Sequence, residues 1–187
     1  MVMTAEALAA ARQVKLVIFD VDGVLTDGGI YIGPQGELFK AFNAKDGLGV
    51  SLWHKAGGKT AIITGRTSEQ LACRAQELGI SRVWQGQRDK RAAYRELKEA
   101  FGLADEEIAY IGDDLIDLPV MLQVGFTGAP ADASPEVRRI ASVVSGLPGG
   151  HGAVREVLEF LLKAQGKWEA LLGLFAVQPA DAAGLAQ

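Results

Sequence analysis

Two carboxylates stand one residue apart where the first long apolar run of the sequence ends. The run 14–19 is followed by Asp20 and Asp22. A carboxylate can attack phosphorus and form an aspartyl phosphate, which splits hydrolysis into two easier displacements. A second carboxylate nearby can protonate the leaving oxygen and later accept a proton from water. We therefore predict that Asp20 is a nucleophile and that Asp22 is a general acid and base, with Gly23 letting peptide N–H groups face the phosphoryl oxygens.

A second acidic cluster, Gly112 to Asp117, follows another apolar run. Magnesium prefers oxygen ligands and is usually held by one or two carboxylates together with water and substrate phosphate. The side chains of Asp20 and Asp113, with the backbone carbonyl of Asp22, would supply such a site. Acidic residues at a helix N-terminus can instead act only on the helix dipole. However, Asp113 and Asp114 could not both be buried and ionised without a cation, and the cluster therefore predicts a Mg²⁺ site.

Two further polar residues are candidates because of these acidic clusters. Thr64 follows the apolar run 60–63 and can donate a hydroxyl hydrogen bond to a phosphate, although it could equally cap the next helix. Lys90 stands near the start of a predicted helix, where its ammonium could neutralise the nucleophile and the phosphoryl group together. A lone lysine is usually solvated surface, so the prediction of catalytic roles for both residues rests on Asp20 and Asp113.

The elements that must position these residues alternate along the chain. Strand-like segments are expected at 14–19, 60–63, 83–84, 108–111, 124–127 and 143–144, and helix-like segments at 46–56, 68–78, 89–101, 115–123, 135–140 and 153–164. This alternation predicts an α/β fold, Rossmann-like and doubly wound, with a mostly parallel sheet and helices on both faces. Ligands of such sheets bind beyond the carboxyl ends of the strands, so the candidate residues should converge there.

Residues 29–42 interrupt the alternation with two short β-like runs joined by Gly33-Pro34-Gln35-Gly36, which predicts a hairpin. No insertion is long enough for a separate cap domain. The hairpin carries more apolar side chains than a two-stranded ribbon can bury against itself, namely Ile30, Tyr31, Ile32, Leu38, Phe39 and Phe42. We expect self-association through this surface, the alternative being a hairpin that folds back on its own domain.

The composition indicates one globular domain, over residues 1–166, with an extension at 167–187 whose end, 178–187, is expected to be mobile. A net charge of −4 without a run of Lys and Arg argues against nucleic acid as a partner. No segment approaches the ~18 apolar residues of a membrane span. Residues 1–13 predict a short helix without the features of a signal peptide. The single cysteine, Cys73, fits a reducing cytoplasm, and two histidines exclude a His-rich zinc site.

The candidate residues occur in an order that resembles the four motifs of the haloacid dehalogenase-like phosphatases. The motifs are Asp20-Val-Asp22-Gly-Val-Leu-Thr, Thr64-Gly-Arg66, Lys90, and Gly112-Asp-Asp with Asp117. The likeness covers roughly 14–166 and includes the segment Gly149 to Arg155. It implies a Mg²⁺-dependent phosphatase that acts on a phosphorylated eight-carbon sugar acid, in a step towards the lipopolysaccharide inner core of Gram-negative bacteria. It also implies a homotetramer and substrate contacts from Asp22, Asn43, Ala44, Lys45, Asp46, Gly47, Arg66, Arg74 and Lys90.

Three alternatives stay open at the level of sequence. Relatives that act on a nine-carbon, sialic-acid-like phosphate share all four motifs. A phospho-accepting receiver also combines acids, Thr and Lys with magnesium, but its phosphorylated Asp usually ends the third strand, whereas Asp20 ends the first. A non-catalytic binding subunit is the third alternative, although every group that catalysis needs is present.

Overall fold

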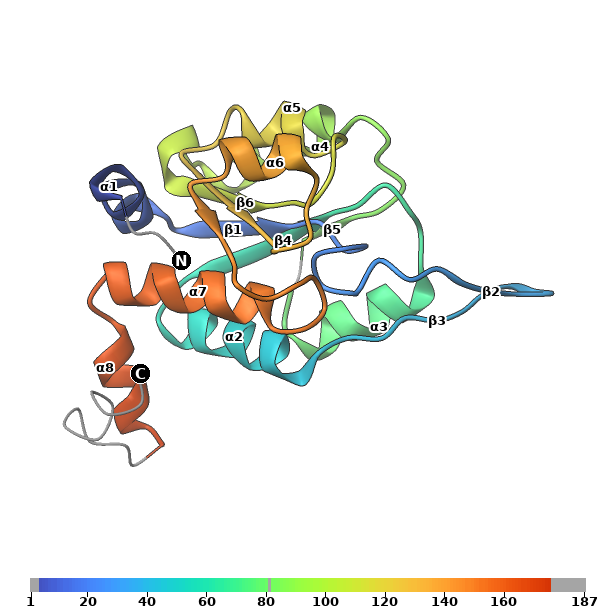
Figure 1. Ribbon diagram of the computed structural model, residues 1–187, viewed down its shortest axis with the longest axis horizontal. Helices are drawn as coiled ribbons and strands as arrows, with labels where there is room; N and C mark the ends of the chain where they lie inside the picture. Colours follow the sequence, from blue (N-terminus) through green and yellow to red (C-terminus); the bar gives the residue numbers. More distant parts are fainter. Residues whose placement is uncertain (1–3, 81, 176–187) are drawn as a thin grey trace.

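The computed structural model describes residues 4–80 and 82–175 and contains a six-stranded sheet whose neighbouring strands are all parallel (Figure 1). In spatial order the strands are β5 (Val83–Trp84), β4 (Lys59–Ile63), β1 (Leu16–Phe19), β6 (Ile108–Ile111), β7 (Phe126–Ala129) and β8 (Val143–Val144). The chain winds outward from β1 to β5, then returns to the other side of β1 through β6. The predicted doubly wound α/β fold is confirmed, and β1 lies at the point where the winding reverses.

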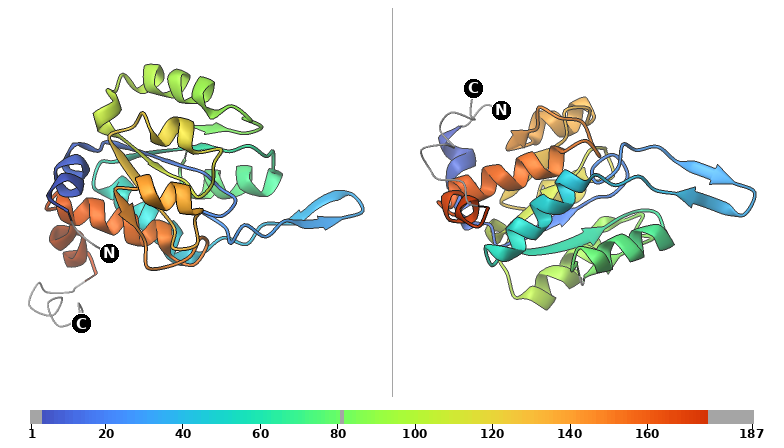
Figure 2. Two further views of the ribbon diagram at one scale, coloured as in Figure 1. Left: turned by 45° about the horizontal axis from the view of Figure 1, so that its top comes forward. Right: turned by 90° about the horizontal axis from the view of Figure 1, so that it is seen from below.

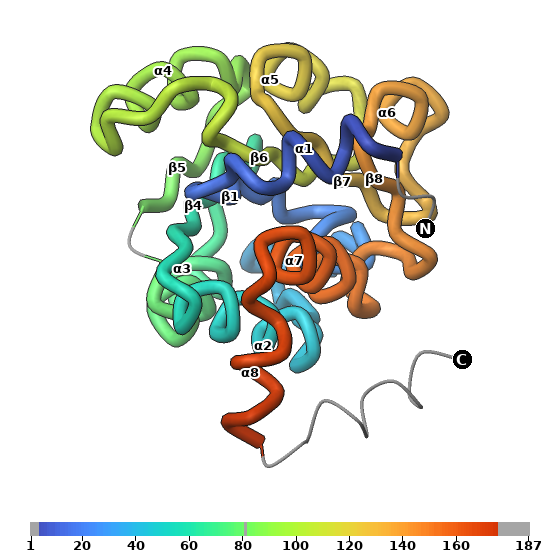
Figure 3. Tube along the Cα trace, turned by 90° about the vertical axis from the view of Figure 1, so that its left-hand side faces the viewer, coloured from blue at the N-terminus to red at the C-terminus, as the bar shows by residue number. Residues whose placement is uncertain are grey.

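Helices cover both faces of the sheet. One face carries α1 (Ala5–Gln13), α2 (Ala44–Lys55), α3 (Glu69–Glu77) and α7 (Ala153–Ala164), and the other carries α4 (Lys90–Phe101), α5 (Leu118–Met121) and α6 (Pro135–Ile140). Figure 3 shows α4 to α6 above the strands and α2, α3 and α7 below them. The 3₁₀ helix η1 (Asp105–Glu107) precedes β6, and α8 (Trp168–Gly173) follows α7.

The sequence of β1 shows why both faces are covered. Leu16 and Ile18 lie in the core beneath α4 to α6, whereas Val17 and Phe19 lie in the core formed with α1, α2, α3 and α7. All four side chains are fully buried. A continuous apolar run of this kind is typical of a strand in the centre of a parallel sheet.

Two predicted boundaries around the second acidic cluster were wrong. The helix expected at 115–123 is reduced to α5, because the inward-turned carboxylate of Asp117 accepts hydrogen bonds from the backbone N–H groups of Asp113 and Asp114 and holds residues 113–117 in a turn. The strand expected at 124–127 begins at Phe126. Gly125 lies so close to the backbone of Glu106 that an added Cβ would come within 2.5 Å of its Cα. The predicted strands 83–84, 108–111 and 143–144 and helices 135–140 and 153–164 match the structure, and the other predicted strands and helices of the main sheet differ from it by one or two residues at their ends.

The predicted hairpin, β2 (Tyr31–Gly33) and β3 (Gly36–Phe39), projects away from the domain (Figures 1 and 2). Its apolar side chains Ile30, Tyr31, Ile32, Leu38 and Phe39 are exposed, and Tyr31 stacks on Phe39 with ring centroids 4.3 Å apart. The described chain therefore does not fold the hairpin back on its own domain. Phe42, which was expected on the same surface, is instead partly buried against the core.

Within residues 4–80 and 82–175 the hairpin is the only folded unit outside the main domain, so no cap domain is present in this part of the chain. Among these residues no helix combines the length and the apolarity that crossing a membrane requires. The mobility expected for 178–187 concerns residues outside the described ranges.

Candidate active site

The register of the sheet brings the predicted residues to one edge. Phe19, the last residue of β1, lies level with Ile62 of β4 and Ile111 of β6. The chains that leave these strands carry Asp20, Thr64 and Asp113 in the same direction, as expected for neighbouring parallel strands. The N–H of Asp20 donates to the carbonyl oxygen of Ile111 at 3.0 Å, which ties the start of the first acidic motif to the strand before the second.

Lys90 is the centre of the site, although it is the first residue of a helix. Asp89 caps α4 by accepting a hydrogen bond from the N–H of Arg91, so the next side chain, that of Lys90, points under the sheet edge with no exposed surface. Its Nζ lies 2.8 Å from Oδ1 of Asp20 and 2.7 Å from Oδ1 of Asp117. Burial would lower the pKa of Lys90, but the two carboxylates outweigh it and raise the pKa. The ammonium is therefore permanently charged.

The negative charges of Asp20 and Asp113 are only partly balanced by neighbouring positive charge. Burial, followed by the charge of Asp117, raises the pKa of Asp20 to about 6, so Asp20 is still mostly ionised at pH 7. Burial and the neighbouring carboxylates, Asp20 first, raise the pKa of Asp113 to about 8. Oδ1 of Asp113 is buried and accepts no hydrogen bond from any described residue. One oxygen each from Asp20, Asp113 and Asp117 lies within 4.8 Å of the others.

Asp117 has a structural part in the site that the sequence did not assign to it. Its Oδ1 accepts hydrogen bonds from Lys90 and from the buried hydroxyl of Tyr110, and its Oδ2 accepts from two backbone N–H groups. Four donors occupy its two oxygens, so this carboxylate is satisfied without a metal. Asp117 therefore orients Lys90 and closes the turn that presents Asp113.

Thr64 is buried directly after β4, and its carbonyl and N–H groups are held by Gln87 and Trp84. It does not cap the helix that follows. Ser68 does so, because its hydroxyl accepts the N–H of Leu71 at 3.2 Å. Thr64 thus lies directly after the carboxyl end of β4, and its hydroxyl is not used to cap the next helix.

Asp22 takes part in a second ionic cluster that reaches it from the base of the hairpin. Lys40 follows β3 and pairs with Oδ1 of Asp22 and, at 3.1 Å, with Oε1 of Glu37. Arg66 approaches Asp22 and Glu37 at 3.6 Å each, and Ser68 donates a hydrogen bond to Glu37. The side chain of Lys40 is only 2% exposed. Sequence reasoning missed Lys40 and Glu37, because charged residues of a hairpin usually face solvent.

The residues at the start of α2 that were predicted to bind substrate differ in their exposure and in their neighbours. Asn43 caps α2 through the N–H of Lys45, and Ala44 and Lys45 are exposed. Gly47 lies against Arg74, whose guanidinium would be 2.4 Å from an added Cβ and which also contacts Phe42 and Glu77. Asp46 is buried, and its oxygens accept backbone N–H groups of Gly152 and Arg155. Asn43 borders a hollow of about 170 Å³ lined by Asp27, Ala41, Phe42, Asn43, Gly150 and His151.

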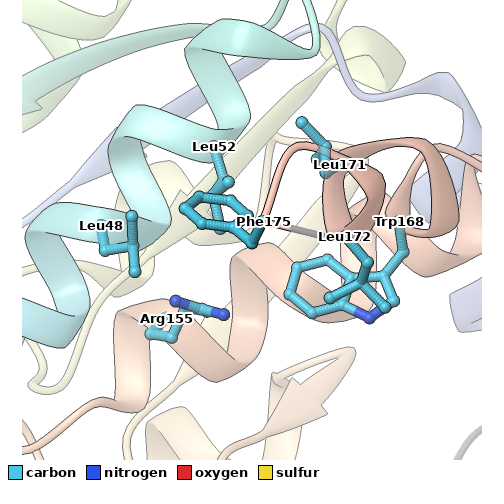
Figure 4. A pocket seen from close by; sticks show the side chains of 7 residues that line it. All are labelled: Leu48, Leu52, Arg155, Trp168, Leu171, Leu172 and Phe175. Atoms are coloured by element: carbon cyan, nitrogen blue, oxygen red, sulfur yellow. The ribbon is translucent and has the colours of Figure 1, made fainter. Parts of the chain in front are cut away.

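A separate apolar cavity of about 160 Å³ lies between α2, α7 and α8 (Figure 4). Its lining residues are Leu48, Leu52, Arg155, Trp168, Leu171, Leu172 and Phe175. Arg155 is the only charged one, and its guanidinium stacks 5.3 Å from the Trp168 ring. The cavity holds none of the acidic residues described above, so it is not the catalytic site.

Comparison with known proteins gives the family. A sequence profile of the haloacid dehalogenase-like hydrolases matches residues 60–157. The 3-deoxy-D-manno-octulosonate 8-phosphate phosphatase of Yersinia pestis is 48% identical over 169 residues, which is 90% of each chain. That of Escherichia coli K12 is 46% identical over 171 residues, 91% of each chain.

This chain belongs to the haloacid dehalogenase-like hydrolases. Among solved structures, the Moraxella catarrhalis 3-deoxy-D-manno-octulosonate 8-phosphate phosphatase, in complex with magnesium, phosphate and KDO, superimposes with a TM-score of 0.88. It is 41% identical, and the match covers 91% of this chain and 98% of that one. Membership in this family confirms the resemblance inferred from the four motifs and excludes a phospho-accepting receiver.

The ion pairs of Lys90 predict that removing its charge destabilises the protein far more than removing an exposed lysine. Lys90→Met should lower the free energy of unfolding by about 3–5 kcal/mol, because it leaves the buried carboxylates of Asp20 and Asp117 without their cation. Urea denaturation at pH 7 in metal-free buffer measures this. The matched control is Lys45→Met on the exposed start of α2, which should change the value by less than about 0.5 kcal/mol. Equal effects of the two substitutions would contradict the described role of Lys90.

Proposed function

We propose that the protein hydrolyses 3-deoxy-D-manno-octulosonate 8-phosphate to the free sugar acid and phosphate, through an aspartyl phosphate on Asp20. The observation that carries this proposal is the buried Lys90, held between Asp20 and Asp117 at the edge of the sheet. A permanently charged ammonium at this point can stabilise negative charge on a phosphoryl group next to the nucleophile. The curated relatives with this activity align over nine-tenths of the chain.

In the proposed first step, an oxygen of Asp20 attacks phosphorus while the bond to the sugar oxygen breaks. Lys90 and the hydroxyl of Thr64 bind the phosphoryl oxygens, and Asp22 protonates the departing sugar oxygen. In the second step Asp22 accepts a proton from the water that attacks the phosphoryl group, and Asp20 is released as a carboxylate. Asp22 begins this cycle in contact with Lys40, so its carboxylate must leave that ion pair to act as an acid.

The donor set fits a magnesium ion. Asp113 offers a buried oxygen that accepts no hydrogen bond from the described residues, and burial together with the charges of Asp20, Asp117 and Asp114 raises its pKa more than Lys90 lowers it. Hard carboxylate oxygens of this kind suit Mg²⁺. We propose Asp20 and Asp113 as side-chain ligands with the backbone carbonyl of Asp22. Asp117 orients the site from behind, because its oxygens already accept four hydrogen bonds. The ion would neutralise the phosphate and make the nucleophile's approach favourable.

We propose that Arg66 and residues at the start of α2 recognise the sugar. Arg66 is 43% exposed and stands beside Asp22, so its guanidinium can bind the sugar carboxylate. We also propose substrate contacts from Asn43, Ala44, Lys45 and Gly47 at the start of α2, where Arg74 packs against Gly47. These positions support an acidic sugar as substrate.

Phosphate release from a panel of sugar phosphates, with magnesium and with excess chelator, tests the proposed function. The eight-carbon sugar acid phosphate should be turned over most efficiently, activity should vanish in chelator, and added Mg²⁺ should restore it. Asp20→Asn is the control, since an amide is a poor nucleophile and a poorer ligand. If the protein prefers a nine-carbon sugar acid phosphate, the proposed substrate is wrong but the proposed mechanism still holds. Full activity of Asp20→Asn in a clean preparation would contradict the mechanism.

Asp113→Asn should have opposite effects with and without metal. The folded-state pKa of Asp113 is raised above its ordinary value of 3.8, so this group destabilises the metal-free protein increasingly as the pH rises from about 4 to 8. Without metal at pH 7, Asp113→Asn should therefore raise the melting temperature. Saturating Mg²⁺ should stabilise the wild type, by about 2.7 kcal/mol at 100 times its dissociation constant, but not the variant. Differential scanning calorimetry measures both, and equal magnesium stabilisation of the two proteins would remove Asp113 from the ligand set.

We also propose that the working unit is a homo-oligomer, a tetramer by resemblance, in which the exposed hairpin packs against other subunits. The stacked Tyr31 and Phe39 and their apolar neighbours support this, because such a projecting apolar surface is unfavourable in water. Light scattering after size exclusion should give a multiple of 19.8 kDa. Ile32→Lys together with Leu38→Lys should reduce that mass. A fully active wild-type monomer would contradict the proposal.

The cytoplasmic location stays a prediction from the sequence.

A further inference from the structure

Asp46 is a buried carboxylate that the proposed mechanism does not use. It lies in the first turn of α2 and is 2% exposed, whereas its neighbours Ala44 and Lys45 are exposed. Its Oδ1 accepts the N–H of Arg155 at 2.8 Å, and its Oδ2 accepts the N–H of Gly152 at 3.2 Å. Both oxygens are therefore turned towards the start of α7, more than a hundred residues away in the sequence.

This contact replaces a cap that α7 lacks. The residue at the N-cap of α7 is Gly152, which has no side chain and a φ of +107°. Helix N-termini leave backbone N–H groups without partners, and a side-chain oxygen normally accepts one from the third helical residue. Arg155 is that residue. Asp46 thus supplies from α2 the acceptor that a local Ser or Asp would supply elsewhere, and its negative charge suits the helix dipole.

The segment before α7 connects this cap to the catalytic loop, here defined as residues 20–26. The N–H of Gly150 donates to the carbonyl oxygen of Val24 at 3.0 Å. Backbone of the two segments is in direct contact, since a Cβ at Gly149 would lie 1.8 Å from the carbonyl oxygen of Gly23. Gly23 in turn has a φ of +90° and lies against Asp113, whose Oδ2 would be 2.1 Å from an added Cβ. Nothing larger than glycine fits at these contacts.

We propose that Asp46 is a positioning residue: by capping α7 from α2 it fixes residues 149–152 against the catalytic loop and so sets the placement of Asp20 and Asp22. The chain of contacts runs from Asp46 to Gly152, through Gly150 to Val24, and through Gly23 to Asp113. Asn43 strengthens it, because its Nδ2 donates to the carbonyl oxygen of Gly150 at 3.0 Å. Small displacements of a nucleophile lower the rate without weakening binding.

The test compares Asp46→Asn and Asp46→Ala with the wild type in the magnesium-loaded protein, well below the melting temperature. This inference rests on the proposed phosphatase activity, so turnover by the wild type is measured first, and its absence would count against the proposed function rather than against Asp46. Asp46→Asn keeps the shape and one acceptor oxygen, which preserves folding if the alanine variant does not fold. We expect kcat to fall about tenfold or more in Asp46→Asn, with KM within about threefold of the wild type.

Thr4→Ala is the matched control, because Thr4 caps α1 through the N–H of Ala7 and α1 also packs on α7, away from the catalytic loop. It should lower the melting temperature but leave kcat unchanged. Hydrogen exchange followed by mass spectrometry gives a readout that is independent of activity. Peptides covering 20–26 and 147–152 should exchange faster in Asp46→Asn and at the wild-type rate in Thr4→Ala.

Two results would overturn the proposal. A raised KM with an unchanged kcat in Asp46→Asn would make Asp46 a substrate contact, as the family resemblance first suggested. An unchanged kcat and unchanged exchange in residues 20–26, with only a lower melting temperature, would make it an ordinary helix cap.

Discussion

The buried charge of Lys90 is the interaction on which the rest of the site depends. An ammonium without exposed surface is tolerated only when carboxylates surround it with good geometry. Asp20 and Asp117 meet that requirement from two different strand ends, and Tyr110 completes the hydrogen bonds. Asp117 then captures the backbone of Asp113 and Asp114, which shapes the second acidic turn. One charge therefore links the end of β1, the start of α4 and the turn at residues 113–117.

The excess of carboxylates over cations is the main electrostatic feature of the site. The buried carboxylates of Asp20 and Asp117 and the half-buried carboxylate of Asp113 lie together beside one ammonium, and burial with these neighbouring charges raises the pKa of Asp113 to about 8. Such a cluster favours binding of a divalent cation and, with it, a phosphate. At the base of the hairpin, Lys40 forms a further ion pair with Asp22.

Sequence patterns predicted the parts of the site that follow from strand order. Asp20 and Asp113 could be placed at one edge because each follows an apolar run, and parallel strands end on the same side. The pairing of Asp22 with Lys40 could not be predicted, because it depends on how the hairpin leaves the sheet. The contact of Asp46 with α7 joins residues far apart in sequence, and a glycine at the helix start gave no local sign of a cap. Helix α5 was predicted too long, since the inward turn of Asp117 overrides the helical pattern of 115–123.

The most direct test of the account is to find where the phosphoryl group resides during turnover. Wild-type protein with Mg²⁺ and the eight-carbon sugar acid phosphate is quenched in acid within the first turnover, digested and analysed by mass spectrometry. The account predicts a transient phosphoryl group on the peptide that contains Asp20, absent from Asp20→Asn and gone once the substrate is exhausted. Steady release of phosphate without any phosphorylated protein, or with the phosphoryl group on another residue, would contradict it.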